Sequence, residues 1–161
     1  WLVGGLVVFI GGVFDMFDGT LARATGKVSP LGAFMDSVFD RWGEAIVYLG
    51  IVVGGARAGS DAVVILAAAA LGAAFMVSYT RAKSEGLGFT AGTGMAAIGV
   101  MPREVRLVIL SLGLIVAGIA GDLLILQIAL GIIAIGATIT VIQRILHVRS
   151  QAKSAATTSI E

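Results

Sequence analysis

Four aspartates within apolar sequence near the start of the chain constrain its fold more than any other feature. Asp15 and Asp18 close one apolar run, and Asp36 and Asp40 lie inside the next. A carboxylate at the centre of a membrane helix costs roughly 2.5–3.5 kcal/mol, so four of them would cost about 10–14 kcal/mol. A bound metal ion is the obvious partner to offset this cost.

The spacing of the aspartates predicts two facing helices. Asp15 and Asp18 are three residues apart and Asp36 and Asp40 are four apart, so each pair lies on one helix face. Between the pairs, residues 26–30 include Gly and Pro, which favour a chain reversal. Antiparallel helices would let the carboxylates converge, and oxygen ligands suit Mg²⁺, Mn²⁺ or Ca²⁺. We therefore expect one or two divalent cations here.

The aspartates also belong to a longer pattern that extends over 26 residues. It resembles the full signature of the CDP-alcohol phosphotransferases, in every position and every gap. The positions are Asp15, Asp18, Gly19, Ala22, Arg23, Gly32, Asp36 and Asp40. The resemblance implies an integral membrane enzyme that transfers a phosphatidyl group from a CDP-linked lipid, such as CDP-diacylglycerol, to an alcohol with release of CMP.

The same resemblance implies roles for the signature residues. Asp15, Asp18 and Asp36 would ligate Mg²⁺ (or Mn²⁺), and Asp40 would bind metal or take the proton of the acceptor hydroxyl as the catalytic base. One or two ions fit this expectation. The residues expected to contact CDP are Asp18, Gly19, Ala22, Arg23, Gly32 and Asp36.

Composition predicts an all-α integral membrane protein. Of the 161 residues 58% are hydrophobic and 13% charged, against about 25% charged in soluble domains. Apolar runs long enough to cross a bilayer predict five transmembrane helices, at 1–25, 30–54, 61–83, 103–119 and 122–149. Relatives in the resembled family have six, so we expect the first to be missing, with a truncated membrane domain at 1–149 and a flexible cytoplasmic tail at 150–161.

The basic residues predict the orientation of this membrane domain. In the five-helix arrangement, Arg57 alone among the 11 Lys and Arg residues falls at one face, and the others fall at the opposite face. The positive-inside rule makes the crowded face cytoplasmic, together with the aspartates. We therefore expect a multi-pass protein of the cell membrane with a cytoplasmic active site. No separate basic domain suggests nucleic-acid binding.

Polar and basic residues from three predicted helices predict an anion site beside the aspartates. They are Ser78, Arg81, Lys83, Arg103, Arg106 and Arg144. This set holds more positive charge than one pyrophosphate needs, so a phosphorylated acceptor is expected. It resembles the phosphatidylinositol phosphate synthase branch, although Arg81 and Lys83 stand in exchanged order. Inositol 1-phosphate is the first expectation and glycerol 3-phosphate the alternative, while topology-setting cations that bind anionic lipid head groups are a third.

Two further expectations concern the assembly of the protein and an alternative function. The resembled family implies a homodimer. Intramembrane carboxylates also serve ion pathways, so a divalent-cation transporter is the alternative from another functional class, although a basic rim would repel cations.

Overall fold

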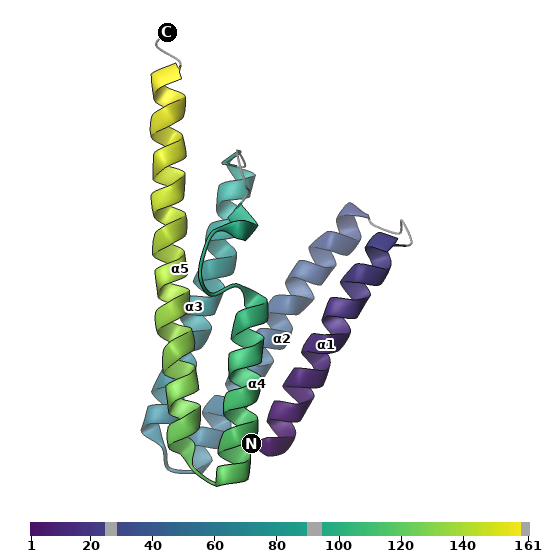
Figure 1. Cartoon of the computed structure of the whole chain (residues 1–161), viewed down its shortest axis with the longest axis vertical. Coiled ribbons are helices and arrows are strands. Elements are labelled where there is room, and N and C mark those ends of the chain that lie inside the picture. The colour runs from purple at the N-terminus through teal and green to yellow at the C-terminus, as the bar shows by residue number, and fades with distance from the viewer. Residues whose placement is uncertain (25–28, 90–94, 159–161) are drawn as a thin grey trace.

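The computed structural model describes residues 1–24, 29–89 and 95–158, with side chains for all of these except 15–24, 96 and 155–158. These residues contain five α-helices and one 3₁₀ turn, and no strand occurs among them (Figure 1). They are α1 (Leu2–Ala24), α2 (Pro30–Arg57), α3 (Asp61–Gly86), η1 (Met95–Ala97), α4 (Arg103–Ala120) and α5 (Leu123–Thr158). The prediction of an all-α fold is confirmed.

The helix bounds follow capping signals in the sequence. Ser29 precedes α2, and its hydroxyl accepts the N–H of Gly32 at 3.0 Å, while Pro30 needs no partner at the first helical position. Helix α4 ends at Ala120, and the next residue, Gly121, has a φ of +67°, a left-handed conformation that glycine adopts without steric cost. Local chemistry therefore fixes where the predicted helices begin and end.

The end of α5 differs from its predicted position. The sequence predicts an end at residue 149, but the helix continues to Thr158. The added residues include Gln151, Ala152 and Lys153, which all favour helix, and neither Gly nor Pro interrupts them. The flexibility expected for residues 150–161 stays a prediction.

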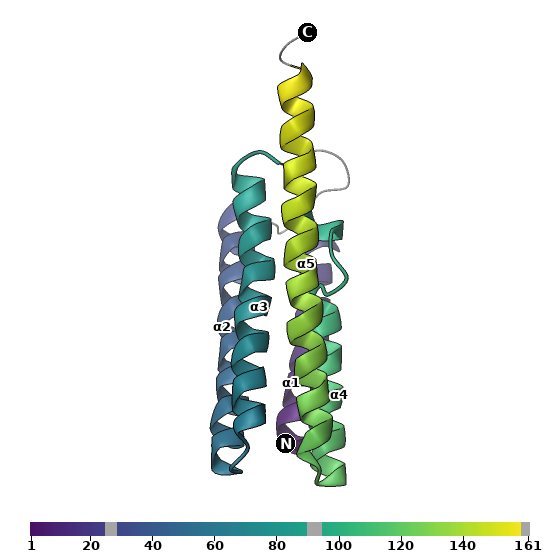
Figure 2. The same ribbon diagram turned by 90° about the vertical axis from the view of Figure 1, so that its left-hand side faces the viewer.

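The helices form two layers, which Figure 2 shows side by side. Helices α2 and α3 pack together in one layer, and α1 packs against α4, which packs against α5, in the other. Helix α3 joins the layers through its contact with α5, around buried residues such as Ala67, Ala70 and Ile133. Small side chains on α3 let the two backbones approach closely. Helices α1 and α2 lean away from α5 toward the upper end in Figure 1.

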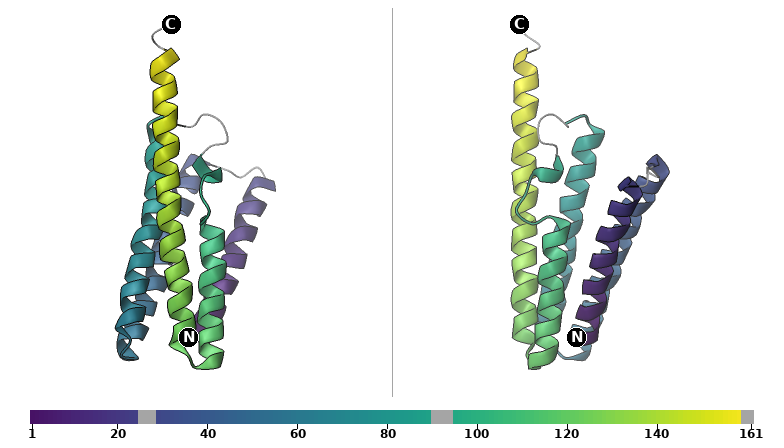
Figure 3. Two further views of the ribbon diagram at one scale, coloured as in Figure 1. Left: turned by 60° about the vertical axis from the view of Figure 1, so that its left-hand side comes forward. Right: turned by 45° about the vertical axis from the view of Figure 1, so that its right-hand side comes forward.

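The last residues before α4 lie beside α5 (Figure 3). The N–H of Met101 donates to the buried Thr140 hydroxyl at 3.0 Å, and the N–H of Val100 donates to Gln143 Oε1 at 3.2 Å. The Arg144 guanidinium donates to the carbonyls of Ile98 and Val77. Residues 98–101, here called the strap, therefore fix the point at which α4 begins.

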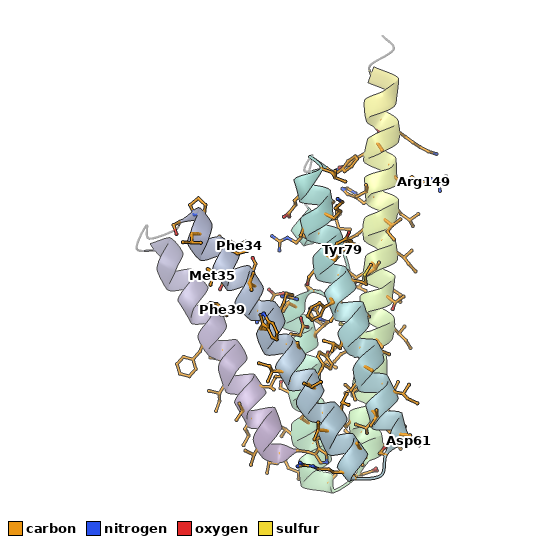
Figure 4. All side chains as sticks on the ribbon, turned by 180° about the vertical axis from the view of Figure 1, so that it is seen from behind. Phe34, Met35, Phe39, Asp61, Tyr79 and Arg149 are labelled. Carbon is orange, nitrogen blue, oxygen red and sulfur yellow. The ribbon has the colours of Figure 1, made fainter. Side chains whose placement is uncertain are left out.

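Large apolar side chains cover much of the outer surface. Phe34, Phe39 and Ile119 are each more than 60% exposed, and the first two are labelled in Figure 4. In the part of the chain that the structure describes, α3 and the Leu123–Ser154 part of α5 are long and apolar enough to cross a membrane. Leu2–Phe14 is a shorter apolar segment. The described part thus supports two of the five predicted spans by length and composition.

Candidate functional site

The described aspartates of the signature share one cavity. Asp36 and Asp40 lie one turn apart on α2, and both line a cavity of about 600 Å³. The side chain of Asp36 is exposed, whereas that of Asp40 is 19% exposed. The spacing predicted that these two carboxylates lie on one helix face, and the structure places them so.

The cavity lies between the two layers, and its walls come from four helices. Helix α2 contributes the two aspartates and Ser37, while α3 and α4 contribute Arg81 and Arg103. The remaining wall is largely apolar, and it consists of Val8, Phe9, Gly12, Val13, Ala33, Glu104, Leu107, Val108 and Ser111. A charged rim beside an apolar wall suits a ligand with an ionic head and an apolar body.

Asp40 is ion-paired in this structure. Arg103 Nη2 lies 3.0 Å from Asp40 Oδ1, and Arg41 Nη2 lies 3.7 Å from Asp40 Oδ2. All three side chains are less than a quarter exposed. These two ion pairs hold the Asp40 carboxylate at the wall of the cavity.

The other half of the predicted metal site falls on side chains outside the described set. Asp15 and Asp18 lie in the last turns of α1, as do Gly19, Ala22 and Arg23, and only the backbone helix is described there. Among described side chains, no group of three or more His, Cys, Asp and Glu gathers. The two described aspartates supply oxygen donors of the type that Mg²⁺ and Mn²⁺ prefer, so the described part fits such a cation.

Gly32 has a local role that the sequence analysis did not assign. A Cβ at this position would lie 3.1 Å from the Ser29 hydroxyl, which caps α2 through the Gly32 N–H. That separation is tighter than ordinary van der Waals contact. Glycine at this position therefore protects the helix cap, whatever it contributes to CDP binding.

The six residues predicted to bind the acceptor phosphate do not gather around one cavity. Arg81 and Arg103 line the aspartate cavity, and Arg81 also pairs with Glu85 at 3.0 Å. Lys83 and Arg144 line a separate, smaller cavity of about 180 Å³ between α3 and α5. Arg106 lies buried at 1% exposure.

Arg106 and Ser78 already bind other side chains of the protein. The guanidinium of Arg106 donates to Glu44 through Nε and Nη2, and its Nη1 donates to the Met101 carbonyl at 3.1 Å. The Ser78 hydroxyl accepts Arg41 Nη1 at 2.6 Å. Of the predicted set, Arg81 and Arg103 are therefore the two that line the same cavity as the described aspartates.

Sequence reasoning missed Glu44 and Arg41, which join this network. Arg41 Nη1 donates to Glu44 Oε2 at 2.7 Å, and Glu44 is 5% exposed. A signal was available, because Glu44 lies four residues after Asp40 and continues the acidic face of α2. A buried carboxylate needs partners, and that requirement favours a pairing of Glu44 with the basic residues of α4.

Comparison with known proteins agrees with the resemblance. The family model described as CDP-alcohol phosphatidyltransferase matches residues 1–143. The chain is 33% identical over 150 residues to an archaetidylinositol phosphate synthase of Pyrococcus horikoshii, covering 93% of the chain and 71% of the relative. It is 34% identical over 158 residues to a phosphatidylinositol phosphate synthase of Streptomyces avermitilis, covering 94% and 63%. The chain thus spans about two thirds of the length of these relatives.

Solved structures share the fold. A Mycobacterium tuberculosis phosphatidylinositol phosphate synthase with CDP-DAG bound matches with a TM-score of 0.78 and 28% identity, covering 91% of this chain and 73% of that one. The same enzyme in complex with manganese and citrate matches with a TM-score of 0.76 and 28% identity, covering 91% and 69%. Both similarities extend over nearly the whole described fold.

Proposed function

Because the chain belongs to the CDP-alcohol phosphatidyltransferase family, we propose that it transfers the phosphatidyl group of a CDP-linked lipid to inositol 1-phosphate. The products are phosphatidylinositol phosphate and CMP. Relatives named as phosphatidylinositol phosphate and archaetidylinositol phosphate synthases support this acceptor. Both kinds of name occur among them, so the lipid is either a diacyl or an archaeal-type lipid.

One observation carries the proposal. Two signature aspartates, Asp36 and Asp40, line a cavity whose rim also holds Arg81 and Arg103 and whose remaining wall is largely apolar. Acidic oxygens suit a cation on a pyrophosphate, and the arginines suit a second phosphate. An apolar wall between helices suits the lipid part of the donor. A single cavity therefore holds groups for each part of the proposed reaction.

The divalent cation would be held by Asp15, Asp18, Asp36 and Asp40. When bound, Mg²⁺ or Mn²⁺ neutralises charge on the donor's pyrophosphate. A relative's structure in complex with manganese supports a divalent ion. We expect one or two ions.

The chain's own residues perform the remaining steps. An acceptor hydroxyl oxygen attacks the phosphorus that carries the lipid, and the bond from that phosphorus to the bridging oxygen of CMP breaks. Asp40 takes the hydroxyl proton, for which it must lie within about 3 Å of that oxygen. Arg103 binds the acceptor's phosphate, and Arg81 adds positive charge at the rim. In this arrangement Arg103 exchanges its pairing with Asp40 for the incoming phosphate.

The proposed placement puts all five helices across the cell membrane. Arg57 and Asp61 lie at one end of the helices, and Tyr79 and Arg149 lie toward the other, which Figure 4 shows for Asp61, Tyr79 and Arg149. The arginine-rich end is cytoplasmic by the positive-inside rule, and the active site opens on that side. Reaction of introduced cysteines with an impermeant reagent in intact cells tests this orientation. A homodimer is the family expectation, tested by crosslinking in membranes.

Acceptor choice is tested with radiolabelled CDP-diacylglycerol and purified protein. Inositol 1-phosphate, glycerol 3-phosphate and serine are offered separately, with Mg²⁺ or Mn²⁺, and labelled lipid product is measured. We expect product with inositol 1-phosphate and little with serine. Product with glycerol 3-phosphate alone would move the proposal to phosphatidylglycerophosphate synthesis. Metal flux into proteoliposomes without CMP release would favour a transporter instead.

A further inference from the structure

Two ion pairs connect α2 and α4, and each pair is here called a rung. Asp40 and Glu44 lie one turn apart on α2, and Arg103 and Arg106 lie one turn apart on α4. Arg103 Nη2 lies 3.0 Å from Asp40 Oδ1, and Arg106 Nη2 lies 2.8 Å from Glu44 Oε1. The first rung lines the aspartate cavity, and the second does not.

The two rungs differ in burial. In the first, the side chains of Arg103 and Asp40 are 22% and 19% exposed, whereas in the second those of Arg106 and Glu44 are 1% and 3% exposed. A partly exposed pair can exchange partners with an incoming ligand at modest cost. Separating a buried pair leaves two charges without compensation, which is strongly unfavourable. The buried rung is therefore the fixed one.

The hydrogen bonds of the buried rung hold both partners in place. Arg106 Nε donates to Glu44 Oε1 at 3.0 Å, and Nη2 reaches both carboxylate oxygens, at 2.8 and 3.2 Å. Arg106 Nη1 donates to the carbonyl of Met101 in the strap, and Arg41 Nη1 donates to Glu44 Oε2 at 2.7 Å. Every nitrogen of this guanidinium has a protein partner, and the side chain is buried away from the aspartate cavity, so Arg106 does not face a substrate phosphate there.

The backbones of α2 and α4 belong to different layers and do not pack extensively on each other. The ion pairs therefore connect the two helices beside the apolar core that they share around Tyr48 and Leu110. A shift of α2 by one turn along α4 would place Arg103 opposite a different residue of α2. The buried rung opposes such a shift, because both of its charges would lose their partners.

We propose that the Glu44–Arg106 pair positions the catalytic face of α2, by fixing the register in which Arg103 meets Asp40. Glu44 and Arg106 are positioning residues, and they do not contact the substrate. This inference rests on the proposed phosphatidyl transfer. The sequence predicts that Arg106 binds the acceptor phosphate. In this proposal it instead lies one helical turn from Arg103, which binds that phosphate.

Charge-conserving variants test the proposal. Arg106→Lys keeps the charge but loses the planar two-nitrogen geometry, and Glu44→Asp shortens the carboxylate by one methylene. We expect kcat/KM for the phosphorylated acceptor to fall about tenfold in each, as misplacement of a binding group does, with KM for CDP-diacylglycerol changed by less than about threefold. Arg57→Lys and Asp61→Asn, at the opposite end of the helices, are the matched controls and should retain the wild-type kcat/KM.

A double-mutant cycle separates positioning from stability. If the buried rung acts through Arg103, then Arg106→Lys should cost less than about threefold in an Arg103→Ala background, because the partner to be positioned is already absent. The same factor in both backgrounds would overturn the proposal. So would variants that lose the fold together with the activity, since the pair would then serve stability alone. Wild-type protein without transferase activity would instead refute the proposed function.

Discussion

The Thr140 hydroxyl accepts the backbone N–H of Met101 at 3.0 Å and donates to the Gly136 carbonyl at 2.9 Å. Together with Gln143 and Arg144, this buried side chain holds the strap against α5, and α4 begins two residues after Met101. The position of Arg103, and with it the first rung on Asp40, therefore depends in part on a hydroxyl in a different helix.

Replacing Thr140 with Val should destabilise the protein by about 1–3 kcal/mol, because the isosteric side chain leaves the Met101 N–H buried without a partner. Thermal unfolding in detergent measures this loss. Thr138→Val is the matched control, since Thr138 is exposed and bonds only the Ala134 carbonyl of its own helix, at 2.8 Å. Equal stability of the two variants would contradict the assigned role of the strap.

Adding a methyl group at Gly118 should force α1 away from α4. A Cβ there would lie 2.3 Å from the Leu2 nitrogen and 2.7 Å from its Cα, which are backbone atoms that cannot move alone. Overpacking of this kind costs about 1–3 kcal/mol or more, so Gly118→Ala should lower the unfolding temperature. Gly131→Ala is the control, because no atom lies within 4 Å of a Cβ there and alanine favours helix. A Gly118 variant as stable as the control would contradict the close crossing.

Asp40→Asn should reduce transfer by about 10²-fold or more, since the side chain can no longer accept the hydroxyl proton. The variant should remain folded and should still bind the CDP-lipid, which equilibrium binding in detergent measures. A chelator should abolish turnover by the wild-type enzyme, and added Mg²⁺ or Mn²⁺ should restore it. Full turnover by Asp40→Asn would remove this residue as the base.

Arg103→Ala should raise KM for the phosphorylated acceptor by about tenfold or more, because a charged hydrogen bond to phosphate contributes about 1.5–3 kcal/mol. KM for the CDP-lipid should change much less. Steady-state kinetics with each substrate varied in turn separates the two effects. Arg57→Ala removes one positive charge at the end of α2 that lies far from Asp40, and it serves as the control. An unchanged acceptor KM would exclude Arg103 from the acceptor site.

Local signals made the fold predictable. Ser29 with Pro30, and Gly121 at the end of α4, mark helix bounds through chemistry confined to a few residues. The pairing of Asp36 with Asp40 on one face follows in the same way from helix periodicity. The site was only partly predictable, because the partner of Arg106 lies 62 residues away in the chain. The sequence predicts Arg106 to bind the acceptor phosphate, and only tertiary packing shows that it is buried on Glu44.

Helices α1 and α2, which carry the signature, are each fastened to a different neighbour, α4 and α3. Both helices nevertheless line the same cavity, through residues such as Phe9 of α1 and Asp36 of α2. In the proposed reaction, a bound CDP-lipid would therefore contact both layers at once and join them through the substrate itself.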